Sequence, residues 1–205
     1  RCTSNSSRVT RSSRRRPLRS ASRKFADLLG DWHAVPFRLD PVMRGTVERA
    51  CGRDMQLPPG RSALVIDARG AGVVTVRMDG ANCEALQVTT TGQVVGAGAG
   101  WSGSGPDVVP APNPSRLADV QDQLVEGGDL RVTGWSVLGR AGAGVAVVLV
   151  EPLGRPVVTA TLENGWFGAW WPARPGDPAV DGLRNPPRVI RAYDALGTLL
   201  DEVRS

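Results

Sequence analysis

Apolar and polar residues alternate along most of the chain in short runs, and turn residues separate these runs. Runs of this kind that are rich in Val, Ile and Thr are typical of antiparallel strands. We expect strands over Ser62–Ala68, Gly72–Met78, Cys83–Thr90, Gln93–Val95, Leu130–Leu138, Val145–Glu151, Pro156–Leu162, Trp166–Trp171, Arg188–Tyr193 and Thr198–Val203. Asn164-Gly165 is a strong two-residue hairpin signal, because both residue types tolerate a positive φ angle.

Two segments instead carry the spacing of a short helix. Asp40 is a suitable N-cap and Pro41 a suitable first helical residue, and we expect Gly52 to end that helix. A second helix is expected over Pro114–Val125, where one face would carry Leu117, Val120, Gln121 and Leu124.

These elements predict a mainly β fold with two units. Residues 129–205 are expected to form an antiparallel, sandwich-like domain, and residues 25–95 a smaller β-hairpin unit with a short helix. The Gly/Pro-rich segment 96–128, which includes the second expected helix, would connect them. Residues 1–24 are rich in Arg and Ser and have few aliphatic residues, so they predict a disordered basic tail.

Charge is unevenly distributed along the 205 residues. The chain carries 25 basic and 20 acidic residues, and nine of the basic ones lie in residues 1–24, which contain no acid. Residues 25–205 therefore hold 16 basic and 20 acidic residues, a net charge of −4. The tail is open to three interpretations: charge-driven binding to nucleic acid or an anionic membrane surface, the start of an export signal, or a flank without a role. The acidic body argues against nucleic acid as the partner.

The three cysteines are Cys2, Cys51 and Cys83. A Cys51–Cys83 disulfide would tie the segment before the first hairpin to the segment after it, and would stabilise the fold by about 3–4 kcal/mol. The alternative is a pair of buried free thiols. A disulfide would favour an oxidising compartment outside the cytoplasm. Whether Cys2 is free stays open. Because the chain has no Cys-x-x-Cys motif and no histidine near these cysteines, the sequence predicts no zinc site.

The sequence offers no recognisable catalytic constellation. His33 is the only histidine, and no motif names a nucleophile to accompany it. The glycine-rich stretch Gly96–Gly105 lacks the Gly-Lys-Ser/Thr of a phosphate-binding loop. Asp177, Asp181 and Asp194 lie in expected loops without the alternating oxygen ligands of a calcium site. We therefore expect no enzyme activity, no catalytic residue, no cofactor and no metal ion.

The most distinctive cluster is aromatic and lies on one expected strand. Successive side chains of a strand point to opposite faces. One face would therefore carry Trp166 and Trp170, and the other Phe167 and Trp171. Large aromatic residues on both faces require both faces to be covered, either by the rest of the chain or by a ligand such as a sugar or a peptide. The second alternative makes these four aromatic residues candidate binding residues.

The stretches GRAGAGVAVVLVEPLGRPVVTATLENGWFGAWWP (residues 139–172) and RVIRAYDALGTLLDEV (residues 188–203) resemble uncharacterised extracytoplasmic proteins of actinobacteria. Those proteins carry a C-terminal β-sandwich-like domain with a GWFxAWWP motif. The preceding ACGRDM and ALVIDARGAGVVTVRMDG segments resemble their other half, so the resemblance covers residues 41–203. Several of them have one membrane-spanning segment upstream, where this chain has its Arg/Ser-rich stretch.

This resemblance implies a secreted or membrane-anchored protein and transfers no catalytic residue. We therefore expect a non-enzymatic extracytoplasmic domain for sensing, interaction or cell-envelope contact. Its partner would be an unknown protein or envelope component, and membrane association would depend on a segment N-terminal to this sequence. The alternatives are a basic-tailed protein that binds nucleic acid or an anionic membrane nonspecifically, and an enzyme of unknown type.

Overall fold

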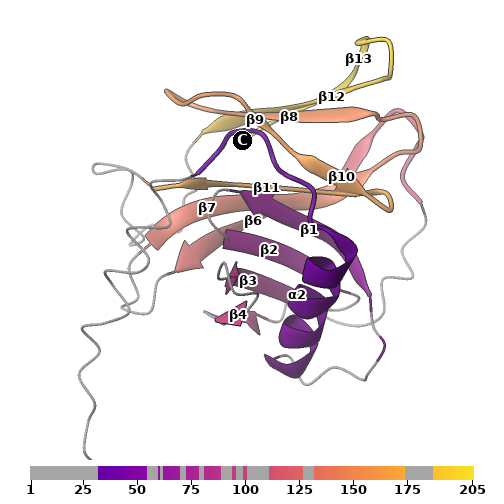
Figure 1. Cartoon of the computed structure of the whole chain (residues 1–205). Helices are drawn as coiled ribbons and strands as arrows, with labels where there is room; N and C mark the ends of the chain where they lie inside the picture. The colour runs from indigo at the N-terminus through magenta and orange to yellow at the C-terminus, as the bar shows by residue number, and fades with distance from the viewer. Residues whose placement is uncertain are drawn as a thin grey trace, which may run out of the picture.

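The computed structural model describes residues 32–54, 60, 62–69, 73–78, 81–88, 94–95, 99–100, 111–126, 132–173 and 187–205. These residues form three antiparallel sheets and one helix, so the predicted mainly β fold is confirmed. Figure 1 shows the sheets as successive layers, which we call the first, middle and third sheets.

The sheets differ in strand order. The first sheet has the order β1 (Ala63–Arg69), β2 (Val73–Met78), β3 (Ala81–Val88), β4 (Val94–Val95), and β5 (Ala99–Gly100) also pairs with β3. The middle sheet has the order β10 (Thr161–Glu163), β11 (Trp166–Pro172), β7 (Val132–Ala141), β6 (Leu117–Glu126). The third sheet has the order β13 (Leu199–Arg204), β12 (Arg188–Tyr193), β8 (Val147–Pro152), β9 (Val158–Thr159).

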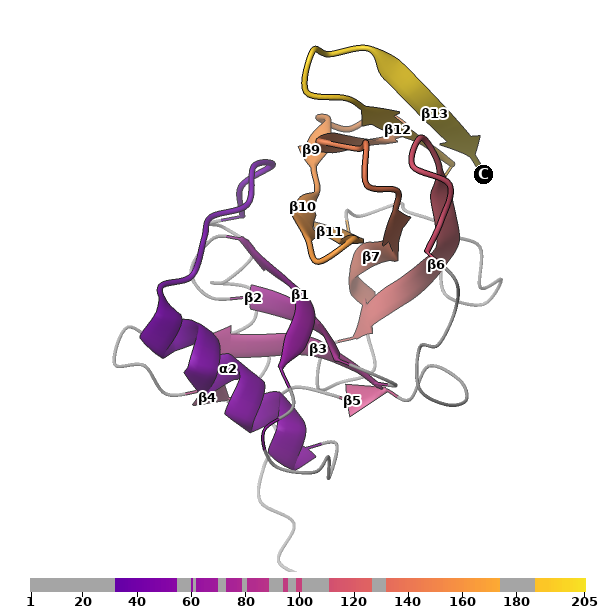
Figure 2. The same cartoon turned by 90° about the vertical axis from the view of Figure 1, so that its right-hand side faces the viewer.

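Helix α2 (Pro41–Asp54) begins as its sequence predicts. The backbone N–H of Met43 donates to Oδ1 of Asp40 at 2.8 Å, so Asp40 is the N-cap. The prediction that Gly52 ends the helix is wrong, because the helix continues to Asp54. A helical glycine costs only about 1 kcal/mol relative to alanine, which does not suffice to stop a helix. The helix buries Val47 and lies along the first sheet (Figure 2).

The second expected helix is also wrong, because Leu117–Glu126 forms strand β6 and pairs with β7. The register slips between Ala118 and Gln121, so two residues of β6 stand opposite Gly139 alone. Asp119, within this bulge, has a φ of 50°. A bulge shifts the alternation of a strand by one position. The helix-like spacing of the apolar residues in this segment is therefore produced by a bulged strand.

The main core lies between the middle and third sheets. It joins Trp135, Phe167 and Trp171 of the middle sheet to Val148, Val150 and Ile190 of the third. Gly139 stands opposite Phe167 in the ladder, and a Cβ there would lie 2.5 Å from the Phe167 ring. The aromatic ring thus occupies the space that any other residue at position 139 would need.

Strand β11 lies inside the middle sheet, between β10 and β7, and is buried on both faces. This confirms the expectation from its aromatic pattern. Asn164 (φ 51°) and Gly165 (φ 74°) form the two-residue turn before it, which also confirms the predicted hairpin with β10. Gly168 faces the first sheet, since a Cβ there would lie 3.7 Å from the Cβ of Asp67. The chain's own first sheet therefore covers the second face of β11.

Candidate functional site

A buried ion pair lies where β1 meets the other two sheets. Nε of Arg69 donates to Oδ2 of Asp67 at 2.7 Å, and Nη2 donates to Oδ1 at 3.0 Å. Both side chains are at most 1% exposed. The hydroxyl of Thr161 also donates to Oδ1 of Asp67, at 2.6 Å. Burial raises the pKa of Asp67, against the lowering effects of Arg69, Thr161 and the backbone N–H of Trp170.

The same guanidinium holds a segment without regular secondary structure, residues 32–37, which bends at Ala34 and Val35 and which we call the strap. Nη1 of Arg69 donates to the carbonyl oxygens of Ala34, at 2.6 Å, and His33, at 3.3 Å. Nη2 also donates to the carbonyl oxygen of Thr159 in β9. Arg69 therefore joins the first sheet, the strap and the third sheet through one side chain.

The strap makes further backbone contacts with the free edges of two sheets. The N–H of Thr159 in β9 donates to the carbonyl oxygen of Ala34 at 2.9 Å, and the N–H of Phe37 donates to that of Ala68 in β1 at 3.0 Å. Figures 1 and 2 show the strap running from beside β9 down to α2. The strap thus bridges the edge strands of the first and third sheets.

Trp32, at the start of the strap, anchors it to the aromatic strand. Its Nε1 donates to the carbonyl oxygen of Trp170 at 3.0 Å. The two indoles pack edge to face, with ring centroids 6.4 Å apart and an interplanar angle of 71°. This is a favourable aromatic geometry, so the strap is fixed by packing as well as by hydrogen bonds.

The strap completes a small pocket on the surface, which we call the Trp32 pocket. It has a volume of about 80 Å³ and is lined by Trp32, Arg155, Pro156, Val158, Trp171 and Pro172. These residues come from the strap, from the β8–β9 turn with β9, and from the end of β11. Nη1 of Arg155 donates to the carbonyl oxygen of Pro172 at 2.6 Å, and this bond links the β8–β9 turn to the end of β11.

The four aromatic residues singled out in the sequence have different environments. Phe167, Trp170 and Trp171 are buried, and Trp166 is partly buried with the Arg140 guanidinium 5.8 Å from its ring centroid. Among these four, Trp171 alone lines the Trp32 pocket. The cluster serves mainly as packing, and its link to a surface is made at one end of β11.

Trp32, Arg155 and the Asp67–Arg69 pair were not predicted from the sequence. Asp67 and Arg69 carried a usable signal, because two opposite charges two residues apart occupy the same face of an otherwise apolar strand. Trp32 gave no such signal, since the residues that it meets are more than 120 positions away along the chain.

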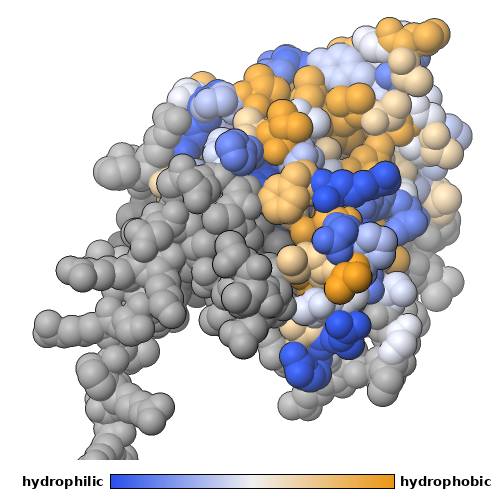
Figure 3. Space-filling model, in the orientation of Figure 1, coloured by the Kyte–Doolittle hydropathy of each residue, from blue (hydrophilic) through white to orange (hydrophobic). Residues whose placement is uncertain are grey.

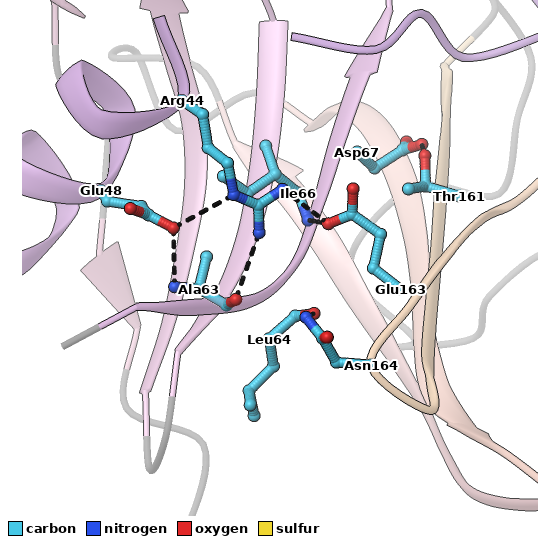
Figure 4. A network of polar contacts seen from close by, with 9 residues as sticks. All are labelled: Arg44, Glu48, Ala63, Leu64, Ile66, Asp67, Thr161, Glu163 and Asn164. Carbon is cyan, nitrogen blue, oxygen red and sulfur yellow. Dashed lines mark hydrogen bonds and ion pairs between the residues drawn. The ribbon is translucent and has the colours of Figure 1, made fainter. Parts of the chain in front are cut away.

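A second polar network ties α2 to β1 and to β10 (Figure 4). Arg44 donates to Glu48 at 3.3 Å, to Glu163 at 2.9 Å and to the carbonyl oxygen of Ala63 at 3.2 Å. Glu48 accepts the Ala63 N–H at 3.0 Å, and Glu163 accepts that of Ile66 at 3.4 Å. These polar groups satisfy one another, so the network positions the helix against the strands.

Other residues considered as chemical candidates have identified surroundings. His33 is exposed and contributes its backbone carbonyl to Arg69. The carboxylate of Asp194 accepts the N–H groups of Thr198 and Leu196 in the β12–β13 turn, and these bonds lower its pKa. Asp177 and Asp181 lie outside the described residues. Within the described ranges, no cluster of three or more His, Cys, Asp and Glu side chains is placed to hold a metal ion.

Cys51 is fully buried in α2 and takes part in a disulfide. The side chain of Cys83 and all of Cys2 lie outside the described parts of the chain, so the pairing with Cys83 stays a prediction. Helix α2 lies in contact with β3, the strand that carries Cys83.

Comparison with known proteins gives no relative: no family model, curated protein or solved structure matches this chain. In the parts of the chain that the structure describes, no helix has the length and apolar character needed to cross a membrane.

Proposed function

We propose that this chain is a non-enzymatic interaction domain that acts outside the cytoplasm and binds a protein or envelope component at the Trp32 pocket. The observation that carries the proposal is the pocket itself. It places the partly exposed Trp32 beside the exposed Pro156, with the buried Trp171 beneath them, and the buried Asp67–Arg69 pair fixes the strap that supplies Trp32. Aromatic side chains of this kind are enriched at binding surfaces.

The surroundings of the pocket support a binding role. Val35 on the strap and Leu153 and Val157 in the β8–β9 turn are exposed by 63%, 73% and 46%. Val35 follows Ala34, whose carbonyl oxygen accepts from Thr159 in β9. Leu153 and Val157 lie in the same turn as the lining residues Arg155 and Pro156. Figure 3 shows hydrophobic side chains gathered on the part of the surface that carries β8, β9 and β12 in Figure 1. Exposed apolar residues around a pocket favour contact with a partner.

The extracytoplasmic part of the proposal rests on separate support. Disulfides persist in oxidising compartments and are rare in the cytosol, and Cys51 takes part in one. The sequence resemblance to extracytoplasmic actinobacterial proteins points the same way. The alternative of nucleic-acid or membrane binding rests on residues 1–24, which lie outside the described structure, and the net charge of −4 on residues 25–205 does not favour it. An enzyme of unknown type is the weakest alternative, because Asp67 and Arg69 are inaccessible to substrate.

The test is a selection of displayed random peptides on the full chain, run in parallel on the wild type and on Trp32→Ala. Leu196→Ala, at a position 92% exposed in the β12–β13 turn, is the control. We expect peptides that bind the wild type and the control but not Trp32→Ala. Because Trp32→Ala also removes a strap contact, Pro156→Glu at the exposed rim is tested alongside. Failure to select any peptide sensitive to either variant would contradict the proposal.

A further inference from the structure

Exposed apolar side chains lie at both ends of the third sheet. At one end the β12–β13 turn presents Leu196, which is 92% exposed, and Val147 and Leu199 are exposed at the strand ends next to this turn. At the other end the β8–β9 turn presents Leu153 and Val157 beside the Trp32 pocket. Figure 1 shows the two turns at opposite ends of the sheet, and Figure 3 shows hydrophobic side chains at the tip of the β12–β13 turn. Each end carries apolar surface that contact with another molecule would remove from water.

The register of the third sheet keeps these two ends apart within one molecule. Val147 pairs with Tyr193 at one end of the β8–β12 ladder, and Pro152 pairs with Arg188 at the other. The stretch of β8 between these pairs spans about 17 Å. Contact between the β12–β13 turn and the Trp32 pocket is therefore possible only between two copies of the chain.

The β12–β13 turn holds Leu196 in a fixed position. Oδ1 of Asp194 accepts the backbone N–H groups of Leu196, at 2.9 Å, and Thr198, at 2.8 Å. The N–H of Asp194 donates to the carbonyl oxygen of Thr198 at 3.0 Å, and the N–H of Gly197 donates to that of Asp194 at 3.1 Å. A turn that is already ordered loses little conformational entropy when it binds.

The tip of this turn and the rim of the Trp32 pocket are also matched in polarity. Asp194 is the only charged residue in the turn, and its carboxylate accepts N–H groups of the turn itself. Insertion of Leu196 therefore buries no unpaired charge. On the other side of the contact, the exposed Pro156 and the partly exposed Trp32 form the apolar rim, above the buried Trp171.

The size of the Trp32 pocket limits the contact to one side chain. Its volume is about 80 Å³, whereas pockets for drug-sized ligands occupy about 300–1,000 Å³. The exposed Leu153 and Val157 extend the apolar surface around the inserted side chain. A contact between one turn and one rim buries less than the roughly 1,200 Å² of a stable interface, so the association is weak and depends on concentration.

From these observations we propose that the partner bound at the Trp32 pocket is a second copy of this chain, which inserts Leu196 of its β12–β13 turn. This inference rests on the proposed function and names the partner. Each copy offers one turn and one pocket at opposite ends of the third sheet. The contact is therefore head to tail, and a copy bound at its pocket still has a free turn with which to bind the next copy.

Analytical ultracentrifugation of the full chain over a range of concentrations tests this. The average mass of the wild type is expected to rise with concentration. Leu196→Asp and Pro156→Glu are each expected to sediment as single chains, because the first variant lacks a functional turn and the second a functional pocket. Val42→Asp is the matched control and is expected to associate like the wild type, since it places the same charge at an exposed aliphatic position on α2.

A milder variant separates loss of the turn from loss of the pocket. Leu196→Ala is expected to weaken self-association roughly thirtyfold, because it removes most of the inserted aliphatic side chain. It leaves the pocket intact, so its binding of the selected peptides is retained.

Mixing the two single-chain variants is the decisive measurement. Leu196→Asp keeps its pocket and Pro156→Glu keeps its turn, so an equimolar mixture is expected to form 1:1 pairs that do not grow further. The Leu196→Ala variant and the melting temperatures of all variants guard against loss of the fold. A mixture that stays monomeric would contradict the head-to-tail contact.

The outcomes distinguish this inference from the proposed function. A wild type that stays a single chain at high concentration, or self-association that Leu196→Asp does not weaken, would overturn the inference. If the display selection still yields peptides that depend on Trp32, the interaction function stands and only the identity of the partner is wrong. A monomeric wild type together with no Trp32-dependent peptide would overturn both.

Discussion

Nη1 of Arg69 lies 2.6 Å from the carbonyl oxygen of Ala34, so a side chain buried in the first sheet directly holds the strap that carries Trp32. The guanidinium is neutralised by Asp67 and also donates to His33 and Thr159 in the strap and the third sheet. One ion pair thereby determines where the strap lies, and the strap forms one wall of the Trp32 pocket.

Arg69→Met is expected to destabilise the protein by about 3–5 kcal/mol, because it leaves the Asp67 carboxylate buried without its charged partner. It also removes the donor shared by three backbone carbonyls. Urea unfolding followed by circular dichroism measures the difference. Arg204→Met, at an exposed ion pair, is the matched control and should change stability by less than about 1 kcal/mol. A similar small effect for Arg69→Met would show that the pair does not hold the sheets together.

Trp170→Ala is expected to cost about 3–5 kcal/mol, as for other large aromatic residues in cores. Trp170 is fully buried, packs against Trp32 and gives it a carbonyl acceptor. Trp166→Ala, at the partly exposed end of the same strand, is expected to cost less. Thermal melting of the two variants checks the order, and a larger loss for Trp166→Ala would contradict the description of β11.

The hairpins and α2 could be predicted because their determinants are local. Asp40-Pro41 starts the helix and Asn164-Gly165 makes the turn, and in each case the deciding residues are neighbours in the sequence. Strand β6 could not be predicted, since the bulge at Asp119 gives it the apolar spacing of a helix. The burial of β11 on both faces was predictable, because leaving large aromatic side chains on either face open to water would forfeit most of their favourable burial free energy.

The candidate site was less accessible to sequence reasoning. The Trp32 pocket combines residues from three segments, and the contacts of Arg69 span up to 90 positions along the chain. Local periodicity contains no information on such pairs. The aromatic strand indicated where the covering elements had to pack, but the sequence alone left open whether the cover was internal or a ligand.

Asp201→Asn is expected to lower stability near neutral pH, with a deficit that disappears in acid. Burial opposes ionisation of Asp201, but hydrogen bonds from the Leu117 N–H, Arg116 and the Glu202 N–H hold its pKa below its usual value. A carboxylate whose pKa is lowered by folding contributes stability above its unfolded-state pKa. That contribution is lost as the pH falls through the folded-state value.

Urea unfolding of Asp201→Asn between pH 7 and strongly acidic pH tests this sign, with Asp119→Asn at an exposed carboxylate as the control. Wild type and Asp201→Asn should begin to converge as the pH falls below the unfolded pKa of about 4, and should have converged once it is below the lower folded-state pKa. A difference that grows in acid would contradict the assignment.

The disulfide partner of Cys51 is expected to be Cys83. Helix α2 lies against β3, and a bridge between these elements closes a loop that should stabilise the fold by about 3–4 kcal/mol. Peptide mapping by mass spectrometry under non-reducing conditions identifies the partner. A Cys2–Cys51 link would contradict the pairing and remove the proposed tie between α2 and the first sheet.

The central claim is that the Trp32 pocket binds a partner polypeptide, and the most direct test is a titration of the full chain with a peptide recovered in the display selection. The indole N–H resonances in proton–nitrogen correlation spectra, assigned with single Trp→Phe variants, report on each tryptophan. We predict saturable shifts for Trp32 and Trp171, while Trp166, at the other end of β11, stays in place. Shifts at Trp166 alone, or no shift at Trp32 and Trp171 at saturating peptide, would contradict the account.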